Sequence, residues 1–306
     1  MRPILLHLDD ALTRQPALRR AVCDRSGLVL DYRDLGPELR LWARPSGLQR
    51  LRNRLATAIP PQDGACLVFS GSGDFHHITP LLLARALEGQ AGQPVTVLHF
   101  DNHPDWVKFG PGSHCGSWVG QAARMAQVSR VLTVGVCSAD IERPAAKGAD
   151  LQLVEEDRVE LYAYRAASAP DAITVCGRHW PTIEGMGEAA FADFLPTRIE
   201  TEAIYLTIDK DVLRPEDAGT NWDQGRTSLA YLKTLIARSL DGHRLIGADV
   251  VGDWSAARYG GGVVSALLKR GEAVLDQPWR PPAPHVLVGN EAVNLALLDH
   301  VLAVAA

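Results

Sequence analysis

The chain has 306 residues, 46% of them hydrophobic and 22% charged, and its net charge is −5. This composition is ordinary for a globular protein, and the mixing of acids and bases excludes the basic footprint of a nucleic-acid-binding or membrane-surface protein. The five cysteines are odd in number and scattered, so we expect no disulfide framework and a reducing, cytoplasmic location. The short apolar run at the N-terminus predicts no signal peptide, and no uncharged apolar stretch predicts a membrane helix.

Short aliphatic runs alternate along the chain with segments of helical periodicity. Strands are predicted at 3–8, 65–70, 94–100, 130–136, 172–177, 203–209 and 244–251. Helices are predicted at 47–58, 80–89, 116–127, 227–240 and 290–304. Continuous apolar strands are typical of a parallel sheet that helices cover on both faces. We therefore predict one domain over residues 1–306, a three-layer α/β/α arrangement around a mostly parallel sheet.

Polar side chains follow four of the predicted strands at the point where each strand ends. The run LVFS leads into GSGDFHH, VTVLHF into DNHPDW, IYLTI into DKD, and LIGAD into VVGDW. In open parallel sheets, ligands bind just beyond the carboxyl ends of the strands. We therefore expect these four strand ends to converge on one edge of the sheet and to form a site there.

Two of these segments alternate acidic and imidazole side chains. Asp101, His103 and Asp105 lie in LHFDNHPDW, and Asp209 and Asp211 lie in YLTIDKD. Residues two apart on an extended chain point to one face, and two carboxylates on one face repel each other unless a cation lies between them. Either motif alone is compatible with a capped helix start or an acidic turn. Their joint occurrence after apolar strands favours a metal site.

A histidine from GSGDFHH, either His76 or His77, would complete a set of six ligands. The set is rich in oxygen and contains some imidazole, which suits Mn²⁺ or a similar divalent ion better than a thiolate zinc site. Four carboxylates carry more negative charge than one divalent ion balances well. We therefore expect two ions, sharing a carboxylate, that activate a water.

The joint pattern resembles the ureohydrolase superfamily of arginases, agmatinases and formiminoglutamases. FDNHPD is similar to the family's Asp-Ala-His-x-Asp segment, and TIDKD to its Ser-x-Asp-x-Asp segment, with Thr207 where Ser is usual. The resemblance implies an arginase-like fold and two Mn²⁺ ions per chain. It implies a hydrolase that cleaves a C–N bond of a guanidino or amidine compound through a metal-bridging hydroxide, with homo-oligomers common in the family. The implied ligands are His76, Asp101, His103, Asp105, Asp209 and Asp211.

The first ligand segment is the poorest match to the family. Aligning Ile78 with the family's apolar residue favours His76 over His77, with Asp74 orienting the ligand. In GPGSHCGSW, His114 is similar in order to a family histidine that shuttles protons, so we expect His114 and the metal-binding Asp105 to act in catalysis. The alternatives are a loop histidine that faces solvent and a Cys–His nucleophile, which would not need the carboxylate cluster.

Substrate recognition departs from the family pattern. Gly252 stands where arginases and agmatinases have a Glu that binds the guanidinium, and Asp253 could supply a carboxylate only if the chain has left the strand by then. Asp140 is the one counterpart of the arginase loop that reads the α-amino group. Trp106 and Trp254 are expected to line an aromatic pocket for a planar cation, with loop packing as the alternative. We expect free L-arginine to be a poor substrate.

Two other functions stay open. The first is a metal-dependent linear-amide hydrolase related to the deacetylases, which is disfavoured because the deacetylase pattern places fewer carboxylates than DNHPD. The second is a metal-binding family member without hydrolase activity, in which the missing Glu marks a lapsed site. Metal content and product release from a panel of compounds would separate these functions.

Overall fold

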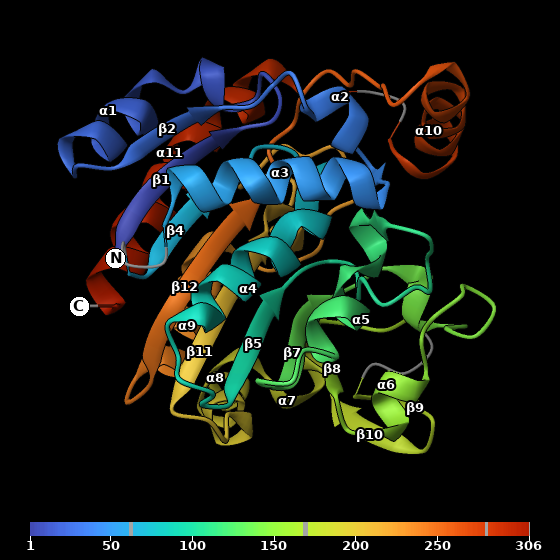
Figure 1. Cartoon of the computed structure of the whole chain (residues 1–306). Helices are drawn as coiled ribbons and strands as arrows, with labels where there is room; N and C mark the ends of the chain where they lie inside the picture. The colour runs from blue at the N-terminus through green and yellow to red at the C-terminus, as the bar shows by residue number, and fades with distance from the viewer. Residues whose placement is uncertain (61–63, 168–170, 279–280, 306) are drawn as a thin grey trace.

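A parallel sheet of eight strands forms the centre of the protein (Figure 1). The computed structural model describes residues 1–60, 64–167, 171–278 and 281–305. The strand order is β2-β1-β4-β12-β11-β5-β7-β8, and every pair in this sheet is parallel. The strands are β1 (Arg2–His7), β2 (Leu28–Asp31), β4 (Cys66–Phe69), β5 (Val95–Phe100), β7 (Val128–Val136), β8 (Val159–Ala163), β11 (Ala203–Asp209) and β12 (Arg244–Val251).

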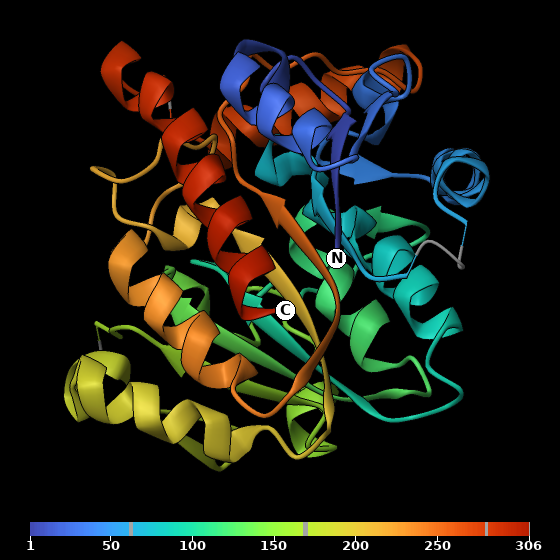
Figure 2. The same ribbon diagram turned by 90° about the vertical axis from the view of Figure 1, so that its left-hand side faces the viewer.

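Helices cover both faces of the sheet, as Figure 2 shows. One face carries α3 (Pro45–Ala58), α4 (Thr79–Glu88) and α5 (Trp118–Ala123). The other face carries α8 (Glu188–Phe194), α9 (Leu229–Leu240) and α11 (Pro284–Val304). The central strands are apolar and fully buried, as expected when helices cover both faces. The predicted three-layer α/β/α arrangement is confirmed.

The seven predicted strands all form, but one of them does not join the main sheet. β9 (Ala172–Val175) pairs antiparallel with β10 (Arg178–Pro181). Cys176 and Gly177 connect them with φ values of 49° and 73°, and two positive φ values are what a tight two-residue hairpin turn requires. The prediction missed β2 and β8, which are the two edge strands of the sheet. It also missed α1 (Pro16–Asp24) and α10 (Val263–Asp276).

Among the described residues, one helix, α11, has the length and apolar composition of a membrane span, which the sequence prediction did not anticipate. The polar groups of this helix bind the rest of the chain. The Asn290 side chain hydrogen-bonds the backbone of Gly219 in both directions, and Asn294 Nδ2 donates to Gln15 and Asp253. About two thirds of its most apolar window is not buried, and its inner side packs on α1 and α9.

Candidate metal centre

The four strands whose ends carry polar motifs are neighbours in the sheet. β4, β12, β11 and β5 lie in this order at its centre, so the predicted convergence of their carboxyl ends is confirmed. A 3₁₀ helix, Gly73–Ile78, follows β4 and carries His76. A second one, Lys210–Val212, follows β11. The segment after β5 has no regular structure, so loops and short 3₁₀ turns carry the site.

A first group of side chains surrounds His76. Its Nδ1 lies 3.1 Å from Asp101 Oδ2, 3.2 Å from Asp105 Oδ2 and 3.7 Å from Asp209 Oδ2. His99 Nε2 lies 2.9 Å from the same Asp101 oxygen. One ligand atom from each of His76, His99, Asp101 and Asp105 can be chosen so that all lie within 4.8 Å of one another. These four side chains are buried, and together they could hold a metal ion.

A second group shares Asp101 with the first. His103 Nδ1 lies 3.0 Å from Asp211 Oδ2 and 3.5 Å from Asp101 Oδ1. Ligand atoms of Asp101, His103 and Asp211 again lie within 4.8 Å of one another. The two carboxylate oxygens of Asp101 therefore face two different groups, which is the arrangement of a carboxylate between two ions. The structure brings all six predicted ligands together, although Asp209 lies beside the first group and not within it.

The electrostatics of this cluster fit a cation. Burial and the nearby charge of Asp101 raise the pKa of Asp209 from 3.8 to about 7. Burial and the charges of Asp101 and Asp209 raise the pKa of Asp211 well above its ordinary value. Crowded, buried carboxylates resist ionisation unless a positive charge compensates them. Gly73 also keeps the space open, because a Cβ there would lie 2.5 Å from Asp209 Oδ2. The donor set therefore fits divalent ions.

Of the two adjacent histidines, His76 alone faces the cluster. His76 Nε2 lies 2.9 Å from Thr207 Oγ1, and Thr207 Oγ1 donates to Asp249 Oδ1 at 2.9 Å. Neither ring nitrogen of His77 has a hydrogen-bond partner among the described residues, and burial lowers the pKa of His77 well below its ordinary value. The geometry therefore favours His76 as the ligand. Asp74 does not orient His76 as expected, because its Oδ2 pairs with Arg40 Nε at 2.6 Å.

Several side chains that the sequence reading missed hold the cluster in place. Asp223 Oδ1 lies 2.8 Å from His103 Nε2, and Trp118 Nε1 donates to Asp105 Oδ2 at 2.6 Å. Carboxylate and indole partners of this kind orient metal ligands. His99 could have been found, because it lies two residues before Asp101 on the extended β5 and so shares a face with it. Asp223 had no comparable signal, and the sequence did not predict the contact between Trp118 and Asp105.

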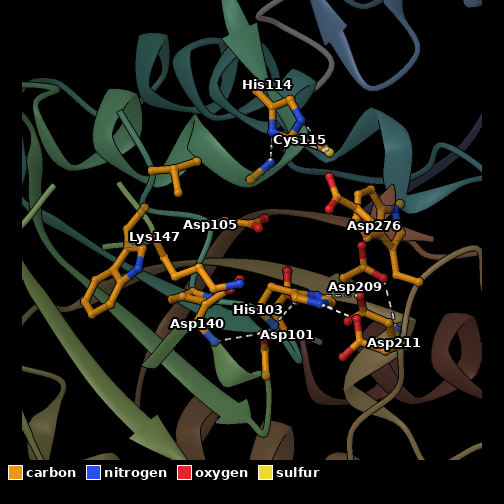
Figure 3. A pocket seen from close by; sticks show the side chains of 18 of the residues that line it. Asp101, His103, Asp105, His114, Cys115, Asp140, Lys147, Asp209, Asp211 and Asp276 are labelled. Atoms are coloured by element: carbon orange, nitrogen blue, oxygen red, sulfur yellow. Dashed lines mark hydrogen bonds and ion pairs between the residues drawn. The ribbon is translucent and has the colours of Figure 1, made fainter. Parts of the chain in front are cut away.

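A cavity of about 440 Å³ opens above the cluster (Figure 3). His114, Asp140, Trp106 and Trp222 are among its lining residues, but Trp106 is only 1% exposed, so its ring packs within the loop. His114 is not in a free loop, because it belongs to β6 (Ser113–His114), which pairs with β3 (Trp42–Ala43). His114 Nδ1 accepts from the Gly116 N–H at 2.9 Å, and Nε2 makes a short hydrogen bond to Glu272. Asp276, from the end of α10, also lines the cavity.

Asp253 and Trp254 do not line the cavity, and their predicted role in substrate binding is wrong. Gly252 has a φ of 96°, so the chain does leave the strand there. The turn, however, directs Asp253 to the buried Lys210, whose Nζ lies 2.5 Å from Asp253 Oδ1. Both Asp253 oxygens are occupied, because Asn294 Nδ2 donates to Oδ2 at 2.9 Å. A buried carboxylate whose charge is already neutralised cannot bind a cationic substrate.

Comparison with known proteins agrees with this geometry. The model of the arginase family matches residues 30–252. The chain belongs to the arginase family. A curated relative, putative agmatinase 3 of Schizosaccharomyces pombe, is 28% identical over 195 residues. This match covers 60% of the present chain but only 42% of the relative, so the chain spans less than half of that protein.

Solved structures of arginase-family proteins share the fold. Arginase from Bacillus cereus superposes with a TM-score of 0.57 at 15% identity, covering 96% of both chains. A hypothetical agmatinase from Burkholderia thailandensis gives a TM-score of 0.55 at 18% identity, covering 98% of this chain and 86% of the other. Proclavaminate amidino hydrolase from Streptomyces clavuligerus gives 0.53 at 15% identity, with coverages of 95% and 91%. At these identities, the likeness establishes the fold of this arginase-family protein and nothing finer.

Proposed function

We propose that the protein is a hydrolase with two Mn²⁺ ions that cleaves a C–N bond of a guanidino or amidine compound. The observation that carries the proposal is the position of Asp101, whose two oxygens face two separate ligand groups at the floor of the cavity. His76, Asp101 and Asp105, with His99 or Asp209 as a fourth ligand, would hold one ion, and Asp101, His103 and Asp211 the other. When bound, such ions supply the Lewis acidity that turns water into a nucleophile at neutral pH.

His114 and Glu272 would move the proton that C–N cleavage requires. Because His114 Nδ1 already accepts from a backbone N–H, the proton that His114 can exchange in this arrangement is on Nε2, shared with Glu272. The Glu272 side chain is 26% exposed, so the pair connects the cavity with solvent. A histidine–carboxylate pair of this kind can protonate a leaving amine and return the proton to water.

The walls of the cavity suit a planar, cationic substrate. Most acidic groups in the walls are already paired: Asp140 lies 3.5 Å from Lys147 Nζ, and Asp223 binds His103. Asp276 makes no hydrogen bond or ion pair with any residue that the structure describes, and its pKa is raised by burial and by the charge of Glu272. In the view of Figure 3, it lies across the cavity from Asp140. Its carboxylate would bind the cation through charge-assisted hydrogen bonds.

The same walls disfavour free L-arginine. Its α-carboxylate would have to compete with Asp140 for Lys147 and would lie among acidic side chains. We propose a guanidino or amidine compound without a carboxylate as the substrate.

Metal analysis combined with a substrate panel tests the proposal. After reconstitution with Mn²⁺, we expect about two ions per chain and release of urea or ammonia from at least one guanidino or amidine compound. Asp211→Ala should lose both metal and turnover. Asp193→Ala is the matched control, since Asp193 is an exposed residue on α8, with 71% of its side chain accessible. Acetate release from acylated amines would favour the amide hydrolase instead, and bound metal without any turnover would favour a metal-binding protein.

A further inference from the structure

α10 carries polar residues on its inner side and apolar residues on its outer side. On the inner side, Lys269 Nζ lies 4.5 Å from the centre of the Trp42 ring, and Trp42 Nε1 donates to Glu272 at 3.1 Å. A surface helix normally has the opposite arrangement. The outer side chains are 51% to 83% exposed: Val263, Val264, Leu267, Leu268, Val274 and Leu275.

These outer residues form one continuous stripe, which we call the α10 stripe. The positions 264, 267, 268, 271, 274 and 275 follow the spacing of three and four residues that places side chains on one side of a helix, and Val263, four residues before Leu267, extends the stripe at its start. Figure 1 shows α10 at the edge of the molecule, away from the central sheet. The stripe holds six of the eight large apolar side chains that are exposed in the described part of the chain. Monomeric proteins rarely expose a contiguous apolar patch, so the stripe indicates an interaction surface.

We propose that the α10 stripe is the contact between two copies of this chain, with the two α10 helices antiparallel. The segment LLKRGEAVL (267–275) places apolar pairs at equal distances on either side of Gly271. A two-fold axis at Gly271 sets Leu267 opposite the partner's Leu275 and Leu268 opposite the partner's Val274. One patch then serves both copies, which closes the dimer. A Cβ at Gly271 would meet no described atom within 4 Å, so the helices can approach closely there.

Glu272 faces inward, where it binds Trp42 and His114, so the apolar side chains of the stripe alone set the antiparallel register. A groove of about 720 Å³ lies along the same helix, lined in part by Val263, Leu267 and Val274, and it offers space for the ridge of a second helix. A 14-residue helix is about 21 Å long, so we expect a small contact that forms at micromolar concentrations.

Sedimentation velocity of the full chain tests the proposal. From micromolar to submillimolar concentrations, the mass should rise from 33.2 kDa towards twice that value. Leu268→Glu should stay monomeric over the whole range, because it places a charge in the stripe without disturbing any buried contact. Val288→Glu is the matched control, since Val288 on α11 is 77% exposed and lies outside the stripe. A chain that remains monomeric throughout, or a dimer that survives Leu268→Glu, would overturn the proposal.

Cross-linking tests the antiparallel register. Helix axes ~8–10 Å apart, with Cα atoms about 2.3 Å from each axis, leave the two Gly271 Cα atoms about 3.4–5.4 Å apart, a span that overlaps the disulfide range. Gly271→Cys should therefore form a covalent dimer on mild oxidation. Gly289→Cys, at an equally open glycine on α11, should not, and neither should Val264→Cys, whose copies would lie about 21 Å apart. Cross-linking at Val264 in place of Gly271 would contradict the two-fold axis. Binding of the monomer to anionic vesicles, abolished by Leu268→Glu, would show that the stripe meets a membrane instead.

Discussion

Thr207→Val would remove one hydroxyl from the buried network behind the metal centre. Asp249 accepts three hydroxyl protons, from Thr79 and Thr207 on Oδ1 and from Tyr205 on Oδ2. Because Thr207 gives its only proton to Asp249, its oxygen must accept from His76 Nε2–H, 2.9 Å away. This hydrogen bond fixes the imidazole tautomer with the lone pair on Nδ1, the atom that faces Asp101 and Asp105.

In Thr207→Val, His76 Nε2–H would be buried without a partner, at a cost of about 1–3 kcal/mol. Loss of such an orienting partner lowers metal affinity by about 10–100-fold, which corresponds to about 1.4–2.8 kcal/mol. The two free-energy ranges agree, and Mn²⁺ titration calorimetry measures the loss of metal affinity directly. Thr207→Ser keeps the hydroxyl and should retain nearly the parent affinity.

Thr133→Val provides a second, matched control. Thr133 is as deeply buried as Thr207, and its hydroxyl lies 3.1 Å from His99 Nδ1. If His99 supports Asp101 without binding metal, this variant should lose less affinity than Thr207→Val. Unchanged Mn²⁺ binding by Thr207→Val, or an equal loss in Thr207→Ser, would refute the orienting role of the hydroxyl.

Three further predictions concern protons and the substrate. His114→Asn should lower kcat by roughly 10²-fold or less with the Mn²⁺ content unchanged, and Glu272→Gln should shift the pH profile of kcat; loss of metal would make His114 a ligand. Asp276→Asn should raise KM for cationic substrates by about tenfold or more and leave uncharged analogues unaffected, whereas a uniform change would exclude a charge contact. The Asp209 pKa, raised from 3.8 to about 7, should make Mn²⁺ affinity fall about tenfold per pH unit below about 7, which competition titrations can measure. Because the folded state holds this proton more tightly than the unfolded chain, the metal-free protein should lose stability as pH rises from about 4 to 7.

The location of the site could be predicted because it depends on sheet topology. Buried apolar strands identified β4, β5, β11 and β12, and parallel pairing forces their carboxyl ends to one edge. The alternation of Asp101, His103 and Asp105 does not lie on an extended strand. β5 ends at Phe100, and Asp105 has a φ of 48°, which no extended strand allows. The turn after β5 therefore brings Asp105 beside Asp101, and the two-residue alternation of an extended strand does not.

The two edge strands and α10 were missed for a different reason. The apolar run of β2 is only the three residues before Asp31, and Glu160 interrupts the apolar residues of β8, so neither strand shows the longer apolar run that identified the central strands. α10 has an apolar stripe of helical period, but that stripe faces outward. Periodicity reports which residues share a side of a helix, but it does not tell which side meets the rest of the protein. The inward position of Glu272 and the place of Asp276 in the cavity wall depend on tertiary contacts that the pattern does not contain.

The surroundings of Gly252 depend on residues that are distant in the sequence. The sequence could predict a positive φ at Gly252, because the chain must leave the strand there. It could not predict that Asp253 pairs with Lys210, because Lys210 follows a different strand. A side chain at position 252 is now excluded, since its Cβ would lie 2.4 Å from Asp209 Oδ1 and 2.5 Å from Lys210 N. A Glu at this position would displace a metal-site carboxylate before it could reach a substrate. A carboxylate for a cationic substrate must therefore come from another element, and Asp276 on α10 is the unpaired one that the described cavity offers.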